Sequence, residues 1–511
     1  MNSNSTQNRT MFIQRIISIT FSIIILLTGM HDAIGQKRTL TLQQAIEVAQ
    51  NSSPDILKSN LNLVSNRKSL DAQRASLKSR FALDVTPFDF NRSRQFNEFF
   101  STFNTNEDYN SFANLSISQP IVQTDGRITL NNRFGYRDNF SEAQANAANN
   151  PDLRTKRYSN NLFIQLDQPI FTYNRTKLQL RELELNLENA QLSNAMQLLS
   201  LERNVTQQFY NFYQAQNNVQ IALDEYENQK TSYEITKNKV EADALAKEQL
   251  YQAELNLATS RSTLQNNEVN LENAADDFKM LLGIDLTEEI EVDVNIDFVT
   301  QKVDLNRAIA FGLENRMELR QREIDVERSQ FEIIRTNALN EFKGSIALSM
   351  GIFGDNRQVT DIYDSPTQNP RVSISFSIPL WDWGEQKARL AASTANQEVA
   401  KIDLNNEKNN IVINIRKVYR NLQNLETQIE IAEQNLKNAQ LTYEINLERY
   451  RSGDLTSIEL NQFQNQLSDK KSEQATALIN YKIELLNLKI QTLYDFEKQQ
   501  PVLFSNNPLD K

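Results

Sequence analysis

The chain contains no cysteine, and its only histidine is His31. Thiolate nucleophiles and disulfides are therefore excluded, and past position 31 so are histidine general bases and Ser-His-Asp triads. The same two residue types supply most zinc and copper ligands. Carboxylate chemistry is the one common class of catalysis left. The sequence thus predicts neither a cofactor nor a metal site, and it argues against most enzymes.

Glycine and proline are also scarce, at 11 and 10 residues in 511. Few helix breakers favour long, uninterrupted helices. The mean hydropathy is −0.56. Beyond the N-terminal region no run reaches the roughly 18–20 apolar residues of a membrane-spanning helix, so a mature chain that crosses a membrane does so as strands. The net charge of −11 makes nucleic acid an unsuitable partner.

Residues 1–35 have the pattern of a secretory signal peptide. Arg9 and Arg15 precede the apolar run 16–27, and Ala33 and Gly35 are small residues at the cleavage positions. The alternative is a retained membrane anchor. Cleavage would remove His31 and export the mature chain.

Two stretches of roughly ninety residues, which begin at Pro169 and Pro379, align without a gap at an offset of 210. Both carry an apolar residue at every seventh position, and each of these matches an apolar residue in the other copy. Because 210 is a multiple of seven, both copies present the same face of a helix to a neighbour. The stripe consists of Val205, Phe212, Val219, Tyr226, Tyr233 and Val240, and of Ile415, Leu422, Ile429, Leu436, Tyr443 and Tyr450.

The helical pattern covers 176–240 and 386–450, and after a short break it returns over 245–282 and 455–493. A helix of about 65 residues is about 100 Å long. Gly453 suits a left-handed turn between the helices of the second copy. Asp243 stands at that place in the first copy, so its turn is expected to differ.

A further repeat, at an offset of 263, pairs the segment from Leu40 to Ile46 with the segment from Val303 to Ile309. Thr41 and Asp304 match in this register and are predicted N-caps of helices about forty residues long. The first repeat then covers 36–282 and the second 304–496. A non-helical connector, 283–303, lies between them, and 497–511 is a tail.

Alternating patterns follow each opening helix and predict strands near 81–90, 160–171, 345–353 and 371–381. Each strand has one apolar and one small or polar face, and ~9–11 residues suffice for a tilted transmembrane strand. The two offsets differ by 53, so the first copy carries an insert of about that length between its strands. An elaborated surface loop and an added hairpin both fit this insert, 90–160.

Aromatic residues mark the ends of the strands. Trp381 and Trp383 follow Pro379, and Phe171 and Tyr173 occupy the matching positions of the first copy. We predict that they form a belt at the membrane interface. The alternative is that they are ordinary core aromatics.

Four amphipathic strands cannot close a barrel, because open edges in lipid leave backbone groups unpaired. Several protomers must therefore share one barrel, and their heptad helices are expected to wrap into a coaxial tube. The predicted fold is mainly α with transmembrane β, built from a duplicated unit of strands and long helices.

Over residues 40–496 the chain resembles the TolC-type outer-membrane efflux proteins, the outer membrane factors. The resemblance rests on the paired openings, on the junctions Gln168-Pro169-Ile170-Phe171 and Ile378-Pro379-Leu380-Trp381, and on the tip segment 450–460. It implies a homotrimer with a twelve-stranded barrel in the outer membrane, four strands per protomer, and a helical tunnel in the periplasm. It also implies a periplasmic adaptor and an inner-membrane pump of the RND or ABC type as partners.

The same resemblance points to a tunnel gate at the second-copy tip, formed by Gly453, Asp454, Glu459 and Gln462. A carboxylate ring is implied at Glu459, whereas Gln462 stands where a second acid is often found. The alternative for Glu459 is a solvated helix charge.

The function implied is a passive exit duct of a tripartite efflux or type I secretion system. One rival is an exported structural coiled-coil protein of the envelope, which leaves the alternating strands unexplained. The other is a secreted, carboxylate-dependent enzyme, which requires a compact cleft. The sequence does not identify the cargo.

Overall fold

The structure is a computed structural model that describes residues 38–98, 101–148, 150, 153–294 and 299–502. The predicted signal peptide lies outside the described residues. Two compact units make up the chain. The helical unit takes residues up to 59, 195–316 and from 411 on, and the sheet unit takes 60–194 and 317–410. Each unit therefore draws on both sequence repeats.

The four long helices follow the heptad pattern. Helices α5 (Arg175–Glu241) and α9 (Glu385–Ser452) run for 67 and 68 residues, and α6 (Lys247–Leu282) and α10 (Ser457–Thr492) return from them. These bounds lie within two residues of those expected, and every member of the apolar stripe is buried or half-buried. In the helical unit the stripe supplies the packing face of α5 and of α9.

The opening helices begin as predicted, but neither is continuous. Thr41 caps α2 (Leu42–Ser52) with a reciprocal capping box, and Asp304 caps α7 (Leu305–Asn315). Extended residues, Ser53 and Arg316, then separate them from α3 (Pro54–Ser76) and α8 (Met317–Asn337). The expectation of single helices of about forty residues was wrong. At Ser53 the reason is local, because a residue that precedes proline avoids the helical conformation.

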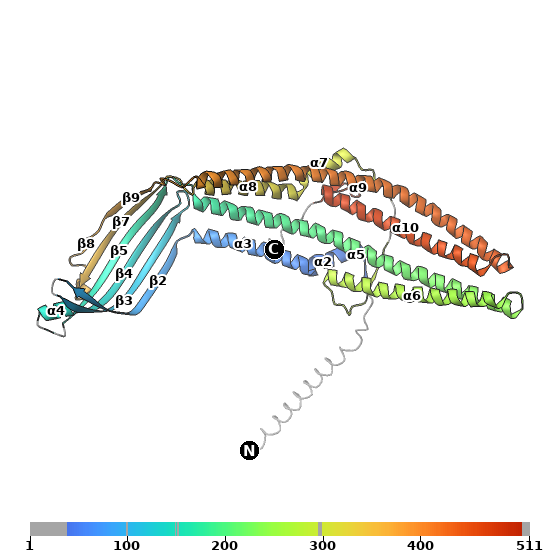
Figure 1. Cartoon of the computed structure of the whole chain (residues 1–511), viewed down its shortest axis with the longest axis horizontal. Helices are drawn as coiled ribbons and strands as arrows, with labels where there is room; N and C mark the ends of the chain where they lie inside the picture. The colour runs from blue at the N-terminus through green and yellow to red at the C-terminus, as the bar shows by residue number, and fades with distance from the viewer. Residues whose placement is uncertain (1–37, 99–100, 149, 151–152, 295–298, 503–511) are drawn as a thin grey trace, which may run out of the picture. The chain divides into compact units, whose positions relative to one another are not determined.

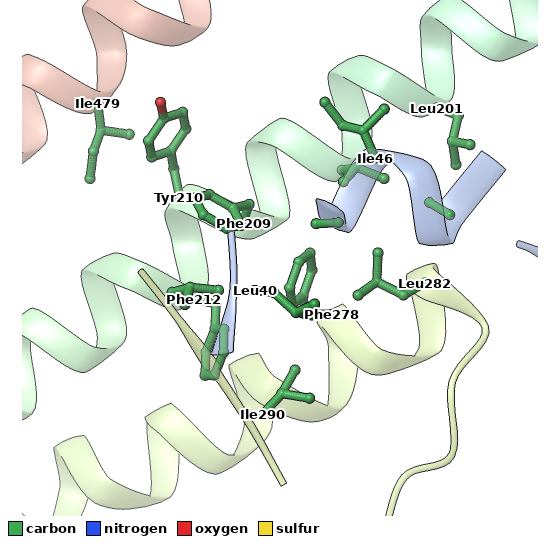
Figure 2. Packing of buried hydrophobic residues seen from close by; sticks show 14 of the residues in the cluster. Leu40, Ile46, Leu201, Phe209, Tyr210, Phe212, Phe278, Leu282, Ile290 and Ile479 are labelled. Atoms are coloured by element: carbon green, nitrogen blue, oxygen red, sulfur yellow. The ribbon is translucent and has the colours of Figure 1, made fainter. Parts of the chain in front are cut away.

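An apolar core closes the helical unit where β1 (Arg38–Leu40) pairs in parallel with β6 (Ile290–Val292) of the predicted connector. Figure 2 shows rings from α5 and α6 gathered beside this pair. Phe209 and Phe278 meet edge to face with ring centroids 6.1 Å apart. The buried members include Leu40, Ile46, Leu201, Val205, Phe209, Phe212, Phe278, Leu282 and Ile290. Two short strands, β10 (Tyr494–Asp495) and β11 (Gln500–Pro501), pair near the end of the described chain.

The sheet unit contains one seven-stranded sheet, in the order β2-β3-β4-β5-β7-β8, with β9 also paired to β7 (Figure 1). Every pair in it is antiparallel. The strands are β2 (Arg80–Asn97), β3 (Thr102–Ile121), β4 (Gly126–Ser141), β5 (Arg154–Ile170), β7 (Lys343–Asn356), β8 (Thr367–Gln368) and β9 (Arg371–Ser377). Two short helices, α4 (Glu142–Ala147) and η1 (Val359–Asp361), lie in its connections.

The insert of the first copy is an added hairpin. It folds as β3 and β4, which lie between the two strands predicted for that copy, β2 and β5. The expected four strands per chain is therefore wrong, because the sheet also contains β3 and β4. The insert alternates polar and apolar residues as the other strands do, so it meets the requirement for pairing within the same sheet.

In-register partners share a face of the sheet, and one face is apolar across all the long strands. It includes Leu83, Leu115, Leu130, Ile164, Met350 and Ile374, all of which are 36% exposed or more in the single chain. Among the described residues, no helix is both long enough and apolar enough to cross a membrane.

Candidate functional sites

Both helical tips turn through the same backbone geometry. Gly453 has a φ of +96° and Asp243 a φ of +53°. In the second copy the amide of Asp454 donates to the carbonyl of Arg449 at 2.9 Å, and in the first copy that of Ala244 donates to Lys239 at 2.8 Å. The expectation of different turns was wrong, because aspartate tolerates the left-handed conformation that glycine adopts freely.

Glu459 lies in the first turn of α10, where it completes a capping box. Its amide donates to the Thr456 hydroxyl, and its carboxylate accepts from the Thr456 amide at 2.9 Å and from that hydroxyl at 2.8 Å. These hydrogen bonds to the charged form lower the pKa of the Glu459 carboxyl. Glu459 and Gln462 are both exposed and, three residues apart, lie on one helix face.

Near the tips, α5 and α9 are joined by hydrogen bonds that the sequence analysis did not anticipate. The buried hydroxyls of Tyr450 and Thr236 are hydrogen-bonded, and the Lys239 ammonium donates to the carbonyl of Tyr450 at 2.9 Å. Tyr450 is only 2% exposed, and burial raises the pKa of its phenol. The apolar stripe therefore ends at its second-copy tip in a polar contact.

The polar character extends along the seam between α5 and α10. Gln229 donates to Asn461 at 3.1 Å, and Gln464 donates to the carbonyl of Glu225 at 3.3 Å. Gln229 and Gln464 are 4% and 2% exposed. Burial, and secondly the charge of Asp469, raise the pKa of the Glu225 carboxyl.

The sequence signal for this polar seam is a second heptad position, which lies four residues before each member of the apolar stripe. In α5 that position is apolar at Leu201 and Ala222 and polar at Asn194, Gln229 and Thr236, and all five side chains are buried. In α9 it changes from Ile411 through Ala432 and Ala439 to Asn446, also all buried. In both helices the member of this series nearest the tip, Thr236 or Asn446, is polar and buried.

The strand-to-helix junctions hold the four predicted aromatics in the sheet unit. Trp381 and Trp383 contact each other edge to face, with centroids 5.7 Å apart, and are 76% and 90% exposed. Phe171 is 62% exposed and lies 5.4 Å from Phe342. Tyr173 is half-buried. Large exposed aromatics fit an interfacial belt better than a core.

The ring cluster at the junction includes Phe342, which the sequence analysis missed. Phe342 stacks on Phe376 of β9, with centroids 5.5 Å apart and planes inclined by 14°. Phe342 lies between α8 and β7, where neither the helical nor the alternating pattern identified it. Phe342 directly precedes β7, and the pairing of β7 with β9 brings its ring against Phe376.

Known proteins match both the helices and the fold. Residues 311–490 match the model of a family described as outer membrane efflux protein. This part of the chain is therefore similar to outer membrane efflux proteins. The chain is 24% identical over 276 residues to the outer membrane protein TolC of Escherichia coli strain K12. That match covers 50% of this chain and 54% of TolC, so the chain spans about half the length of the curated relative it matches.

Solved structures of outer membrane channels resemble this chain over most of its length. The CmeC outer membrane channel of Campylobacter jejuni superimposes with a TM-score of 0.66 at 15% identity, over 91% of this chain and 87% of CmeC. The MtrE outer membrane channel of Neisseria gonorrhoeae gives 0.64 at 13% identity, over 90% of each chain. The chain therefore has the fold of these outer membrane channels.

Proposed function

We propose that this protein is the outer-membrane exit duct of a tripartite efflux or type I secretion system. It would conduct its cargo passively from a periplasmic adaptor and an inner-membrane pump, of the RND or ABC type, to the exterior. The family match is the main support for this proposal. The apolar face of the sheet fits the outer membrane, and the helices of 67 and 68 residues fit a periplasmic tunnel.

Homotrimeric assembly is part of the proposal. One chain exposes a broad apolar sheet face and cannot close a barrel from its own strands, because the smallest membrane barrels have eight. Copies of the same chain are the simplest source of the missing strands, since every copy offers the same two sheet edges for pairing.

The test is reconstitution. The full chain, expressed with its N-terminal segment, should fractionate with the outer membrane and run as a heat-modifiable oligomer. In planar bilayers it should produce discrete conductance steps that a mock preparation lacks. Oligomers that stay in the periplasm and produce no conductance would rule out the duct in favour of a structural envelope protein.

Glu459 is proposed to line the tunnel at the tip. Glu459→Gln is a suitable variant because glutamine also completes a capping box, as Gln44 does with Thr41 in this chain. The charge is therefore removed while the helix start is kept. We expect weaker block of conductance by divalent cations in Glu459→Gln.

The matched control for this variant is Glu448→Gln. Glu448 belongs to the last turns of α9 and is paired with Arg451 at 2.7 Å. Its replacement removes the same charge on the other side of the turn and is expected to leave the block unchanged. Equal block in the native protein and in Glu459→Gln would assign Glu459 to capping alone.

A further inference from the structure

The added hairpin, β3 and β4, affects the dimensions of the duct. This inference rests on the proposed function. Strands β3 and β4 pair with their neighbours along nearly their whole length. Sixteen consecutive residue pairs join β3 to β4, from Asn106↔Ser141 to Ile121↔Gly126. Fourteen pairs join β4 to β5. The hairpin is thus inside the sheet, where it separates β2 from β5.

Its faces match those of the strands on either side. Leu115 pairs with Leu83 of β2, and Ile117 pairs with Leu130, which in turn pairs with Ile164 of β5. On the opposite face, Ser116 pairs with Ala82 of β2 and with Asn131 of β4. The apolar face therefore crosses the hairpin without interruption, as a wall in contact with lipid requires.

A row of aromatic rings crosses the same four strands on the apolar face, near the ends remote from the helices. It consists of Phe90, Tyr109, Tyr136 and Tyr158. Phe90 and Tyr109 are paired in register, with centroids 4.7 Å apart, and Tyr136 and Tyr158 are likewise paired, at 5.1 Å. The stretch from Tyr109 to Ile117, both included, has about the length that a strand needs to cross the hydrocarbon. The row has the position of an outer aromatic girdle, and half of it belongs to the hairpin.

The inner end of the hairpin is fixed to the start of α5 by polar contacts. Asn174 donates to the carbonyl of Val122 at 2.7 Å, and Asp125 accepts from the amide of Thr176 at 3.1 Å. Gln168 donates to the carbonyl of Thr124 at 2.7 Å and accepts from its hydroxyl at 2.8 Å.

These contacts are specific to the copy that carries the hairpin. At the offset of 210, Gln168, Asn174 and Thr176 correspond to Ile378, Gly384 and Gln386. The second copy has no insert at this place and lacks these side chains. The hairpin is therefore built into the junction of the first copy.

The two edges of the sheet are suited to pair with each other in a second copy of the chain. Among the described strands, β2 pairs only with β3, and β9 only with β7. Apart from the two-residue β8, the sheet contains six strands, and neighbouring strands alternate in direction. The sixth strand, β9, is therefore antiparallel to the first, β2. A neighbouring copy can thus add its β2 to β9 and continue the antiparallel order, which removes both open edges.

We propose that each chain contributes six strands to the wall of the pore, so that three copies close an eighteen-stranded barrel. Barrel diameter grows roughly linearly with strand number, so this barrel is about 1.5 times as wide as one of twelve strands. The outer mouth of the duct is widened accordingly, whereas the helical tips are unchanged by the hairpin.

Disulfide trapping tests the position of the hairpin, and the native chain, which has no cysteine, is a clean background. Ala82 and Ser116 are paired across β2 and β3, within the reach of a disulfide. Ala82→Cys with Ser116→Cys should form an intrachain disulfide in the membrane-extracted oligomer. In a wall without the hairpin, β2 would lie next to β5. Ala82 pairs with Ser116, Ser116 with Asn131, and Asn131 with Phe163, so Phe163 is the residue of β5 at the same height in the sheet as Ala82. Ala82→Cys with Phe163→Cys should therefore remain reduced, and its oxidation would overturn the proposal.

Electron cryomicroscopy of the native oligomer in lipid nanodiscs counts the strands directly. The expected result is a ring of eighteen strands with threefold symmetry. A conducting oligomer with twelve strands, from a hairpin outside the wall or from two copies, overturns the six-strand trimer while the exit duct stands. A protein that neither enters the membrane nor conducts overturns the proposed function as well.

Discussion

Glu225 is a residue whose protonation is coupled to folding. Burial and the nearby Asp469 raise the pKa of its carboxyl, so the folded protein holds this proton more tightly than the unfolded chain does. Stability is therefore lost as pH rises from the unfolded pKa through the folded pKa. We expect Glu225→Gln to raise the thermal midpoint at pH 7 relative to the native protein, by a margin that shrinks toward pH 4.

The matched control for Glu225→Gln is the adjacent Asp224, which forms an ion pair with Lys471 at 3.2 Å. Asp224→Asn removes a favourable pair and is not expected to stabilise the protein at pH 7. Thermal scans at several pH values compare the two variants. A margin for Glu225→Gln that is constant with pH would disprove the linkage.

Tyr450 is the residue through which the tip contact between α5 and α9 is best tested. Tyr450→Phe keeps the ring packed and removes its hydrogen bond to Thr236, whose hydroxyl still donates to the carbonyl of Ser232 at 2.7 Å. We expect a loss of ~0.5–1.5 kcal/mol and faster hydrogen exchange confined to the tip.

Tyr419→Phe is the control for this variant. Its hydroxyl accepts from Gln423 at an exposed position of the same helix, at 3.0 Å, and its removal is expected to leave exchange at the tip unchanged. Equal exchange in Tyr450→Phe and the native protein would mean that the tip is held by other contacts.

At the scale of the element, the apolar stripe is the feature that makes the long helices pack. Tyr443 belongs to the stripe and is half-buried, whereas Ile445, two residues later, is 62% exposed. Tyr443→Asp places a charge in the seam and is expected to destabilise the helical unit by ~2 kcal/mol or more. Ile445→Asp should cost little, and thermal unfolding measures both. Equal losses would show that the stripe does not define the packing face.

Elements were predicted well wherever one local pattern decided them. The heptad period located the long helices, and Thr41 and Asp304 were identified as caps because capping depends on three or four adjacent residues. The interruption at Arg316 could not be foreseen, since no local breaker marks it. The turn at Asp243 was misjudged because residue type was weighed over the geometry that the copies share.

At the scale of the whole molecule, the repeats and the compact units do not coincide. The sequence divides the chain lengthwise into two copies, but each folded unit combines segments of both, and α5 and α9 belong to both units. The copies thus supply equivalent elements to shared structures. This arrangement follows from packing between the two sequence repeats of one chain, and the presence of an internal repeat does not by itself specify that packing.

The sequence by itself determined what repeats at short range: the duplication, the heptad face, the alternation of the strands, and the exclusion of cysteine and histidine chemistry. Only the tertiary structure decided that the insert pairs between β2 and β5, and that hydrogen bonds replace apolar packing near the tips. The physical reason is that periodicity sets which side of an element is buried, whereas its neighbour is chosen by contacts between residues far apart in the chain.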